Sequence, residues 1–168
     1  PTVSAGQAGS TMYGFELGVD ADHDYYTTAG SDVAKTLEQI EYSVCVMRAI
    51  YMRDALLRPY LGRVIVRSTL AHDLYTGSTG GTYLDRLRTE WNINQSDTNP
   101  DLVAGVSPSK IGGGLAWTRA VGSSFGYSVS QSGGTGAFDV VGRHELGHNW
   151  SSSHSVGGNP EGTGIMGG

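Results

Sequence analysis

The clearest periodic pattern in the chain predicts one long helix in its first third. Apolar residues recur there at spacings of four, three, four, three and four, which is one face of an α-helix. The pattern consists of Val33, Leu37, Ile40, Val44, Met47 and Tyr51. Asp32 lies in the expected first turn, where a negative charge suits the helix dipole, and Pro59 marks the expected end of the helix.

Other segments predict shorter elements on either side of this helix. Residues 12–20, 62–70, 112–118 and 125–131 have the composition and alternation of strands, whereas residues 81–94 and 136–150 have helical patterns. Residues 20–31 are expected to form a loop, and the glycine-rich tail from residue 151 is expected to be irregular. The resulting order, β-α-β-α-β-β-α, predicts an α+β protein with one mixed sheet and helices packed on it.

Composition narrows the class of protein. The 168 residues suffice for one domain, with 11 basic and 16 acidic side chains giving a net charge of −5. The basic residues are scattered, so we expect no nucleic-acid partner, and no stretch is apolar enough to cross a membrane. The single cysteine excludes a disulfide within the chain. Its 26 glycines and 16% charged residues suggest a secreted enzyme, and we expect a monomer.

Three of the five histidines lie in the eleven-residue stretch HELGHNWSSSH. His144 and His148 are four residues apart, which on a helix places both imidazoles on one face, one turn apart, where they can chelate one metal ion. Glu145 flanks that site and can accept a proton from water. Imidazole ligands around an open tetrahedral position indicate Zn²⁺. By itself the pattern also fits a solvated helix face.

His154 and Met166 extend this motif. His154 can reach the same metal only if the chain leaves the helix after His148 and turns back, and Met166 lies in a glycine-flanked tight turn. The sequence therefore resembles the metzincin zinc endopeptidases, whose signature is HExxHxxGxxH followed by a Met-turn. The resemblance implies that His144, His148 and His154 are zinc ligands, that Glu145 is the general base, and that Met166 is the methionine beneath the metal.

Further stretches are similar to the adamalysin, or reprolysin, branch, of the bacterial type. These are ELGVDADHDYY in the first strand and the loop that follows it, the Asn149 that follows the second histidine, and GLAWT. The resemblance implies a zincin fold with a twisted, mixed five-stranded sheet, two long helices and an active-site helix. It also implies that a peptide or protein substrate pairs with an edge strand, formed here by Gly114, Leu115, Ala116, Trp117 and Thr118.

The chain also departs from this family. Ser155 stands where adamalysins usually carry aspartate, and Ser151 stands where the motif has glycine. We expect Ser151 to adopt the positive φ that turns the chain toward the metal. We expect one catalytic domain over residues 1–168, with an upper part of about 1–150 and a short lower part of 151–168. Family members continue beyond the Met-turn into a helix, so we expect this chain to be truncated there.

Three alternatives remain open at this stage. The first is a zinc-stabilised binding module without catalytic activity, against which the presence of Glu145 argues. The second is a serine hydrolase using Ser124 in the GSSFG stretch, although the following residues predict a strand where a nucleophile elbow needs a helix. The third alternative is a calcium site, formed by Asp20, Asp22 and Asp24, or by Glu16 as the family resemblance implies. For the three aspartates a solvated turn is the favoured interpretation, because the sequence lacks the glycine of a calcium-binding loop. For Glu16, the calcium ligands that family members have near the C-terminus are missing.

Overall fold

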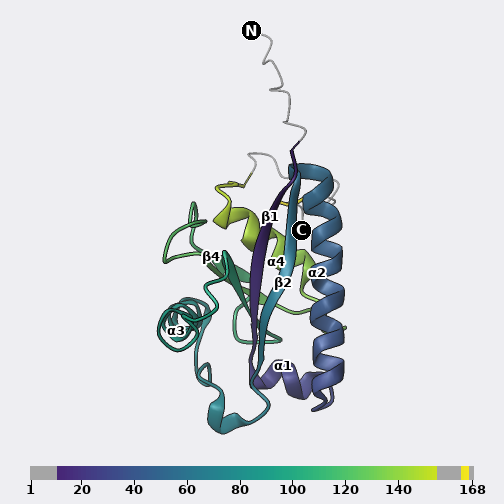
Figure 1. Ribbon diagram of the computed structural model, residues 1–168. Helices are drawn as coiled ribbons and strands as arrows, with labels where there is room; N and C mark the ends of the chain where they lie inside the picture. The colour runs from purple at the N-terminus through teal and green to yellow at the C-terminus, as the bar shows by residue number, and fades with distance from the viewer. Residues whose placement is uncertain (1–10, 155–163, 167–168) are drawn as a thin grey trace.

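A computed structural model describes residues 11–154 and 164–166 of the chain as an α+β fold (Figure 1). One five-stranded mixed sheet has the order β2-β1-β3-β5-β4, in which only β4 runs antiparallel to its neighbour. The strands are β1 (Tyr13–Ala21), β2 (Leu57–Val66), β3 (Leu102–Ser107), β4 (Gly114–Ala116) and β5 (Tyr127–Gln131). The helices are α1 (His23–Thr28), α2 (Val33–Ala55), the 3₁₀ turn η1 (Leu70–His72), α3 (Gly80–Asn94) and α4 (Asp139–Asn149).

The predicted long helix is α2, and its ends have identifiable causes. The Asp32 carboxylate caps the start, accepting hydrogen bonds from the backbone N–H groups of Ala34 at 2.8 Å and Lys35 at 3.2 Å. Leu56 ends the helix in the left-handed region, with φ 54°. The chain then enters β2 five residues earlier than predicted. Pro59 lies inside this strand, which is tolerated because β2 is at the edge of the sheet.

The central strand of the sheet, β3, is absent from the sequence-based prediction, which placed only four strands. Residues 102–107 are all buried, so the segment shows none of the polar and apolar alternation by which the other strands were recognised. Its Gly105 lets helix α3 approach, since a Cβ there would lie 2.6 Å from the Tyr83 ring. The strand pairs with β1 on one side and β5 on the other.

The segment predicted as a loop after β1 contains the short helix α1, and its aspartates contact cationic side chains. Arg67 contacts Asp20 through two hydrogen bonds, at 2.7 and 3.0 Å. The Nζ of Lys110 lies 3.0 Å from the Asp22 carboxylate and 3.2 Å from that of Asp24. These carboxylates are therefore neutralised by side chains of the protein itself.

Helices cover both faces of the sheet and enclose two apolar cores. One core lies between the sheet and helices α2 and α4, and the other lies between the sheet and α3. Figure 1 shows α2 and α3 on opposite sides of the strands. Helix α4 thus rests on the sheet beside β5 and β4, which determines where its side chains point. Among the described helices, none combines the length and apolar character needed to cross a membrane.

Candidate metal centre

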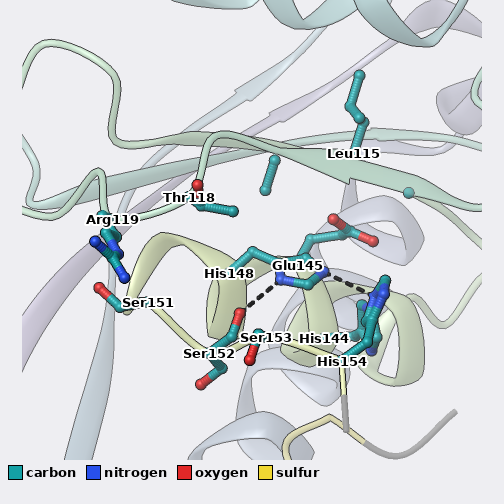
Figure 2. A pocket seen from close by; sticks show the side chains of 12 residues that line it. Leu115, Thr118, Arg119, His144, Glu145, His148, Ser151, Ser152, Ser153 and His154 are labelled. Atoms are coloured by element: carbon teal, nitrogen blue, oxygen red, sulfur yellow. Dashed lines mark hydrogen bonds between the residues drawn. The ribbon is translucent and has the colours of Figure 1, made fainter. Parts of the chain in front are cut away.

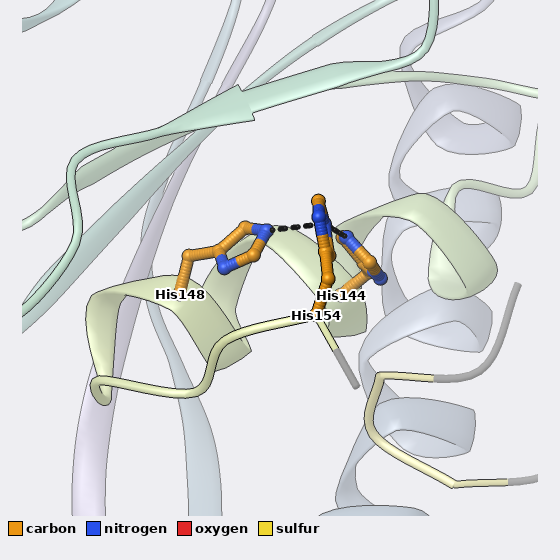
Figure 3. A group of neighbouring side chains, drawn as sticks. All are labelled: His144, His148 and His154. Carbon is orange, nitrogen blue, oxygen red and sulfur yellow. Dashed lines mark hydrogen bonds between the residues drawn. The ribbon is translucent and has the colours of Figure 1, made fainter. Parts of the chain in front are cut away.

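The three histidines of the motif converge on one point (Figure 3). His144 and His148 project from the same face of α4, and His154 comes from the segment that follows the helix. The Nε2 atom of His154 lies 2.9 Å from Nε2 of His144 and 3.1 Å from Nε2 of His148. Within the described residues this is the sole group of three or more histidine, cysteine or acidic side chains with metal-binding spacing.

Backbone carbonyls orient two of the imidazoles. Nδ1 of His148 lies 2.8 Å from the carbonyl oxygen of Ser152, and His144 hydrogen-bonds to the backbone of Met166. A carbonyl accepts but cannot donate, so Nδ1 of His148 carries a proton and its Nε2 faces the other histidines. Burial, followed by the two neighbouring imidazoles, lowers the pKa of His144. Three imidazoles converging on one point form a donor set that suits Zn²⁺.

The turn after α4 carries His154 back toward the helix. Ser151 N–H donates to His148 C=O and Ser152 N–H donates to Gly147 C=O, both at 2.9 Å, which is the hydrogen-bond pattern of a Schellman cap. This cap requires a left-handed residue, and Ser151 has φ 77°. The predicted positive φ is therefore confirmed. Serine in this conformation costs about 1 kcal/mol relative to glycine, and the two backbone hydrogen bonds offset that strain.

The end of α4 is tied to the segment that follows β4. The side-chain amide of Asn149, which is fully buried, donates to the carbonyls of Trp117 at 2.8 Å and Tyr127 at 3.1 Å. The backbone N–H of Arg119 donates to the carbonyl of His148 at 3.1 Å. The Arg119 bond reaches a carbonyl in the last turn of α4, where carbonyls lack an intrahelical partner. Together the three bonds hold the second histidine at a defined distance from the sheet edge.

The described residues 164–166, which include the predicted Met-turn residue Met166, pack against α4. A Cβ at Gly147 would lie 2.7 Å from Met166 Sδ and 2.9 Å from Ile165 Cγ2. Arg143 Nε donates to the carbonyl of Gly164 at 3.1 Å. Sequence reasoning assigned no role to Gly147 or Arg143. The sequence did contain one signal for Gly147, which lies inside a predicted helix. Glycine there is about 1 kcal/mol less favourable than alanine, which indicates a packing reason for its presence.

Replacing Gly147 with alanine should destabilise the protein, because the new methyl group overlaps Met166 and Ile165. Overpacking of this kind costs about 1–3 kcal/mol, which outweighs the gain in helix propensity. Urea unfolding should show a lower midpoint with an unchanged slope. The matched control is Gly81→Ala in α3, where nothing lies within 4 Å of the added Cβ, and which should be neutral or stabilising. Equal effects of the two substitutions would contradict the packing argument.

Glu145 lies on the side of α4 that faces β4 (Figure 2). Its carboxylate packs against Gly114, where any Cβ would collide with it. The residue is 6% exposed, and burial raises the pKa of its carboxyl to about 7. A carboxyl group of this pKa near neutrality is suited to accepting and returning a proton.

A cleft of about 790 Å³ separates β4 from α4. Four of the five residues predicted for the substrate-binding strand line it, namely Gly114, Leu115, Ala116 and Thr118. Trp117 is absent from this lining and packs instead toward α3, with its ring edge-on to that of Phe125 at 5.3 Å. The strand itself is shorter than predicted and covers only residues 114–116.

Ser124 does not occupy a nucleophile elbow. It lies exposed in the turn between β4 and β5, and the chain continues from there into a strand. An elbow needs a strand-to-helix turn that presents the serine at the top of a sheet. The geometry therefore offers no support for the serine-hydrolase alternative.

An HExxH helix beneath the edge strand of a mixed sheet, with a third histidine and a buried glutamate, is an arrangement typical of metallopeptidases. The sequence matches the Reprolysin_5 family profile, described as metallo-peptidase family M12, over residues 13–163. The chain therefore belongs to metallo-peptidase family M12, which supports a zinc-dependent peptidase. No curated protein matches the sequence.

A solved structure titled "Structure of a chaperone-substrate complex" has a similar fold. It superposes with a TM-score of 0.71 at 17% sequence identity and covers 94% of this chain. This chain spans only 28% of the length of that one. At this level of identity the likeness concerns the fold alone.

Proposed function

We propose that the protein is a zinc-dependent endopeptidase of the metzincin type, closest to the adamalysin branch. One observation carries the proposal: three Nε2 atoms converge beside a buried glutamate, directly below the edge strand β4. His144, His148 and His154 would hold the ion, and with three protein ligands it could also bind water or substrate. A bound zinc ion supplies Lewis-acid chemistry that polarises a carbonyl group and acidifies water.

Glu145 provides the proton transfer in this proposal. Its carboxylate accepts a proton from the water that attacks the peptide carbonyl, and it then delivers that proton to the nitrogen of the leaving amine. Helix α4 and the packing against Gly114 hold the carboxylate in place, so no rearrangement of the side chain is needed between the two steps.

The free edge of β4 is the proposed substrate-binding element. Within the described residues β4 pairs only with β5, so its outer N–H and C=O groups can pair with an extended peptide. Gly112 and Gly113, with φ 70° and 112°, precede the strand, and a Cβ added at either would meet nothing within 4 Å, which leaves room for a peptide backbone. We further propose that the enzyme acts as a secreted monomer, on the basis of its composition.

Cleavage of an unstructured protein by the zinc-loaded enzyme, with and without a chelator, tests this function. We expect about one zinc per chain, internal cleavage of the substrate, loss of cleavage with 1,10-phenanthroline, and recovery when zinc is added back. An irreversible serine reagent should have no effect. Tight zinc binding without any cleavage would instead favour the non-catalytic binding module, although a closed structural site ordinarily has four protein ligands.

A further inference from the structure

Arg119 lines the cleft at the end of β4. Among residues 11–154 and 164–166, no hydrogen bond, ion pair or ring contact involves its guanidinium group. The side chain is exposed, and Figure 2 shows it on the same side of the site as Ser151, beyond His148. Glu145, the single acidic residue among the described residues of the lining, lies at the opposite end, beside Gly114. A cationic group is thus available to a ligand in the cleft.

The backbone of Arg119 is held in an unfavourable conformation beside the metal ligands. Its φ is 56°, a left-handed value that costs a non-glycine residue about 1 kcal/mol. Its N–H nevertheless donates to the carbonyl of His148. Strained residues of this kind persist where surrounding contacts determine them, and they concentrate at functional sites. The backbone of Arg119, from which its side chain projects, therefore has a defined position relative to the histidines.

We propose that Arg119 gives the enzyme a preference for an acidic side chain on the N-terminal side of the scissile bond. This inference rests on the proposed peptidase function and on pairing of the substrate with β4. A guanidinium group binds a carboxylate through paired hydrogen bonds as well as charge.

The direction of β4 determines which half of the substrate reaches Arg119. The strand runs from Gly114, next to Glu145, toward Ala116, and Arg119 follows its C-terminal end. A peptide that pairs in the antiparallel sense, the slightly more stable arrangement, places its N-terminal half along that end. The terminal carboxylate of such a peptide lies at the other end of the cleft. The carboxylate that Arg119 contacts must therefore come from an aspartate or glutamate side chain.

Paired peptides that differ only by glutamate or glutamine test the inference. Each of the three positions on either side of the scissile bond is varied in turn, and kcat/KM is measured for the wild-type enzyme, Arg119→Gln and Arg119→Lys. The readout is the kcat/KM of the glutamate peptide divided by that of the glutamine peptide, determined separately for each enzyme. This ratio cancels any effect of the substitution on overall activity. All three residues carry a Cβ, so the backbone strain at this position stays the same.

We expect a ratio of about five at one N-terminal-side position in the wild-type enzyme, as for a partly exposed ion pair. The ratio should fall to about one in Arg119→Gln, remain above one in Arg119→Lys, and decrease at 1 M salt. Arg58→Gln is the control, because Arg58 is an exposed arginine on β2 at the opposite edge of the sheet. That variant should keep the wild-type ratio.

Binding of the same peptides to the Glu145→Gln variant separates this inference from the proposed function. Calorimetry should show the same preference for the glutamate peptide without turnover, and the preference should disappear when Arg119→Gln is added. Cleavage or binding with a ratio of one would overturn the inference while leaving the peptidase function intact. An acidic preference on the C-terminal side would overturn it too. Absence of cleavage would contradict the peptidase function, and the binding ratio would still decide the role of Arg119.

Discussion

Replacing Glu145 with glutamine should lower kcat for peptide hydrolysis by about a hundredfold to ten-thousandfold, the usual contribution of a general base. Glutamine has nearly the same shape, so it preserves the packing against Gly114. It removes none of the three imidazoles, so the zinc content should remain about one per chain. Steady-state kinetics and elemental analysis of the same preparation measure both quantities.

The combination of lost activity and retained zinc is what distinguishes a base from a ligand. Glu41→Gln is a suitable control, since Glu41 is an exposed carboxylate on α2 outside the cleft, and it should leave kcat unchanged. A Glu145→Gln enzyme that cleaves peptides at the wild-type rate would show that another group accepts the proton. A variant that loses zinc would show that Glu145 contributes to holding the metal.

Replacing His154 with alanine should weaken zinc binding by about a hundredfold or more and abolish peptide cleavage. Loss of a hydrogen-bond partner to a metal ligand already costs about ten- to hundredfold in affinity, and loss of a ligand removes a direct bond. His154 lies 2.9 Å and 3.1 Å from the other two Nε2 atoms, so its side chain belongs to the same centre. Competition with a chromophoric chelator measures the change in affinity.

His72→Ala provides the comparison for this variant. His72 is exposed, lies in η1 and hydrogen-bonds to Thr69, away from the cleft. The His72→Ala variant should bind zinc with wild-type affinity, which controls for the general effect of removing a histidine. If the His154 variant held zinc as tightly as the wild-type protein, the ion would be bound by only two residues of α4 and the proposed centre would be wrong.

Local sequence patterns predicted the elements that carry most of the site. The α4 spacing places His144 and His148 on one face of a helix whatever surrounds it, because helical periodicity is a property of the backbone. The same holds for the buried stripe of α2, although its first residue, Val33, is 46% exposed at the end of the helix. The left-handed turn at Ser151 was also predictable, since His154 can return toward the helix only through a sharp turn.

Tertiary packing decided the rest. Strand β3 is the centre of the sheet, but its all-buried sequence lacks alternation, so only its pairing with β1 and β5 identifies it. The environment of Glu145 depends on Gly114, which is 31 residues earlier in the chain. Trp117 lies outside the cleft lining and packs against the apolar core next to α3, with its ring edge-on to that of Phe125. Each of these outcomes depends on contacts between distant segments, which local patterns do not encode.

By itself, then, the sequence determined which residues could form a metal site, since that follows from residue type and helical spacing. The tertiary structure decided how the site is completed. The contact between Gly147 and Met166, the tie from Asn149 to Trp117 and Tyr127, and the placement of Arg119 beside the histidines all join separate segments. The physical reason is that the spacing of residues along one helix determines the direction in which their side chains project. Burial, backbone strain and contacts with a second segment arise only once the chain has folded.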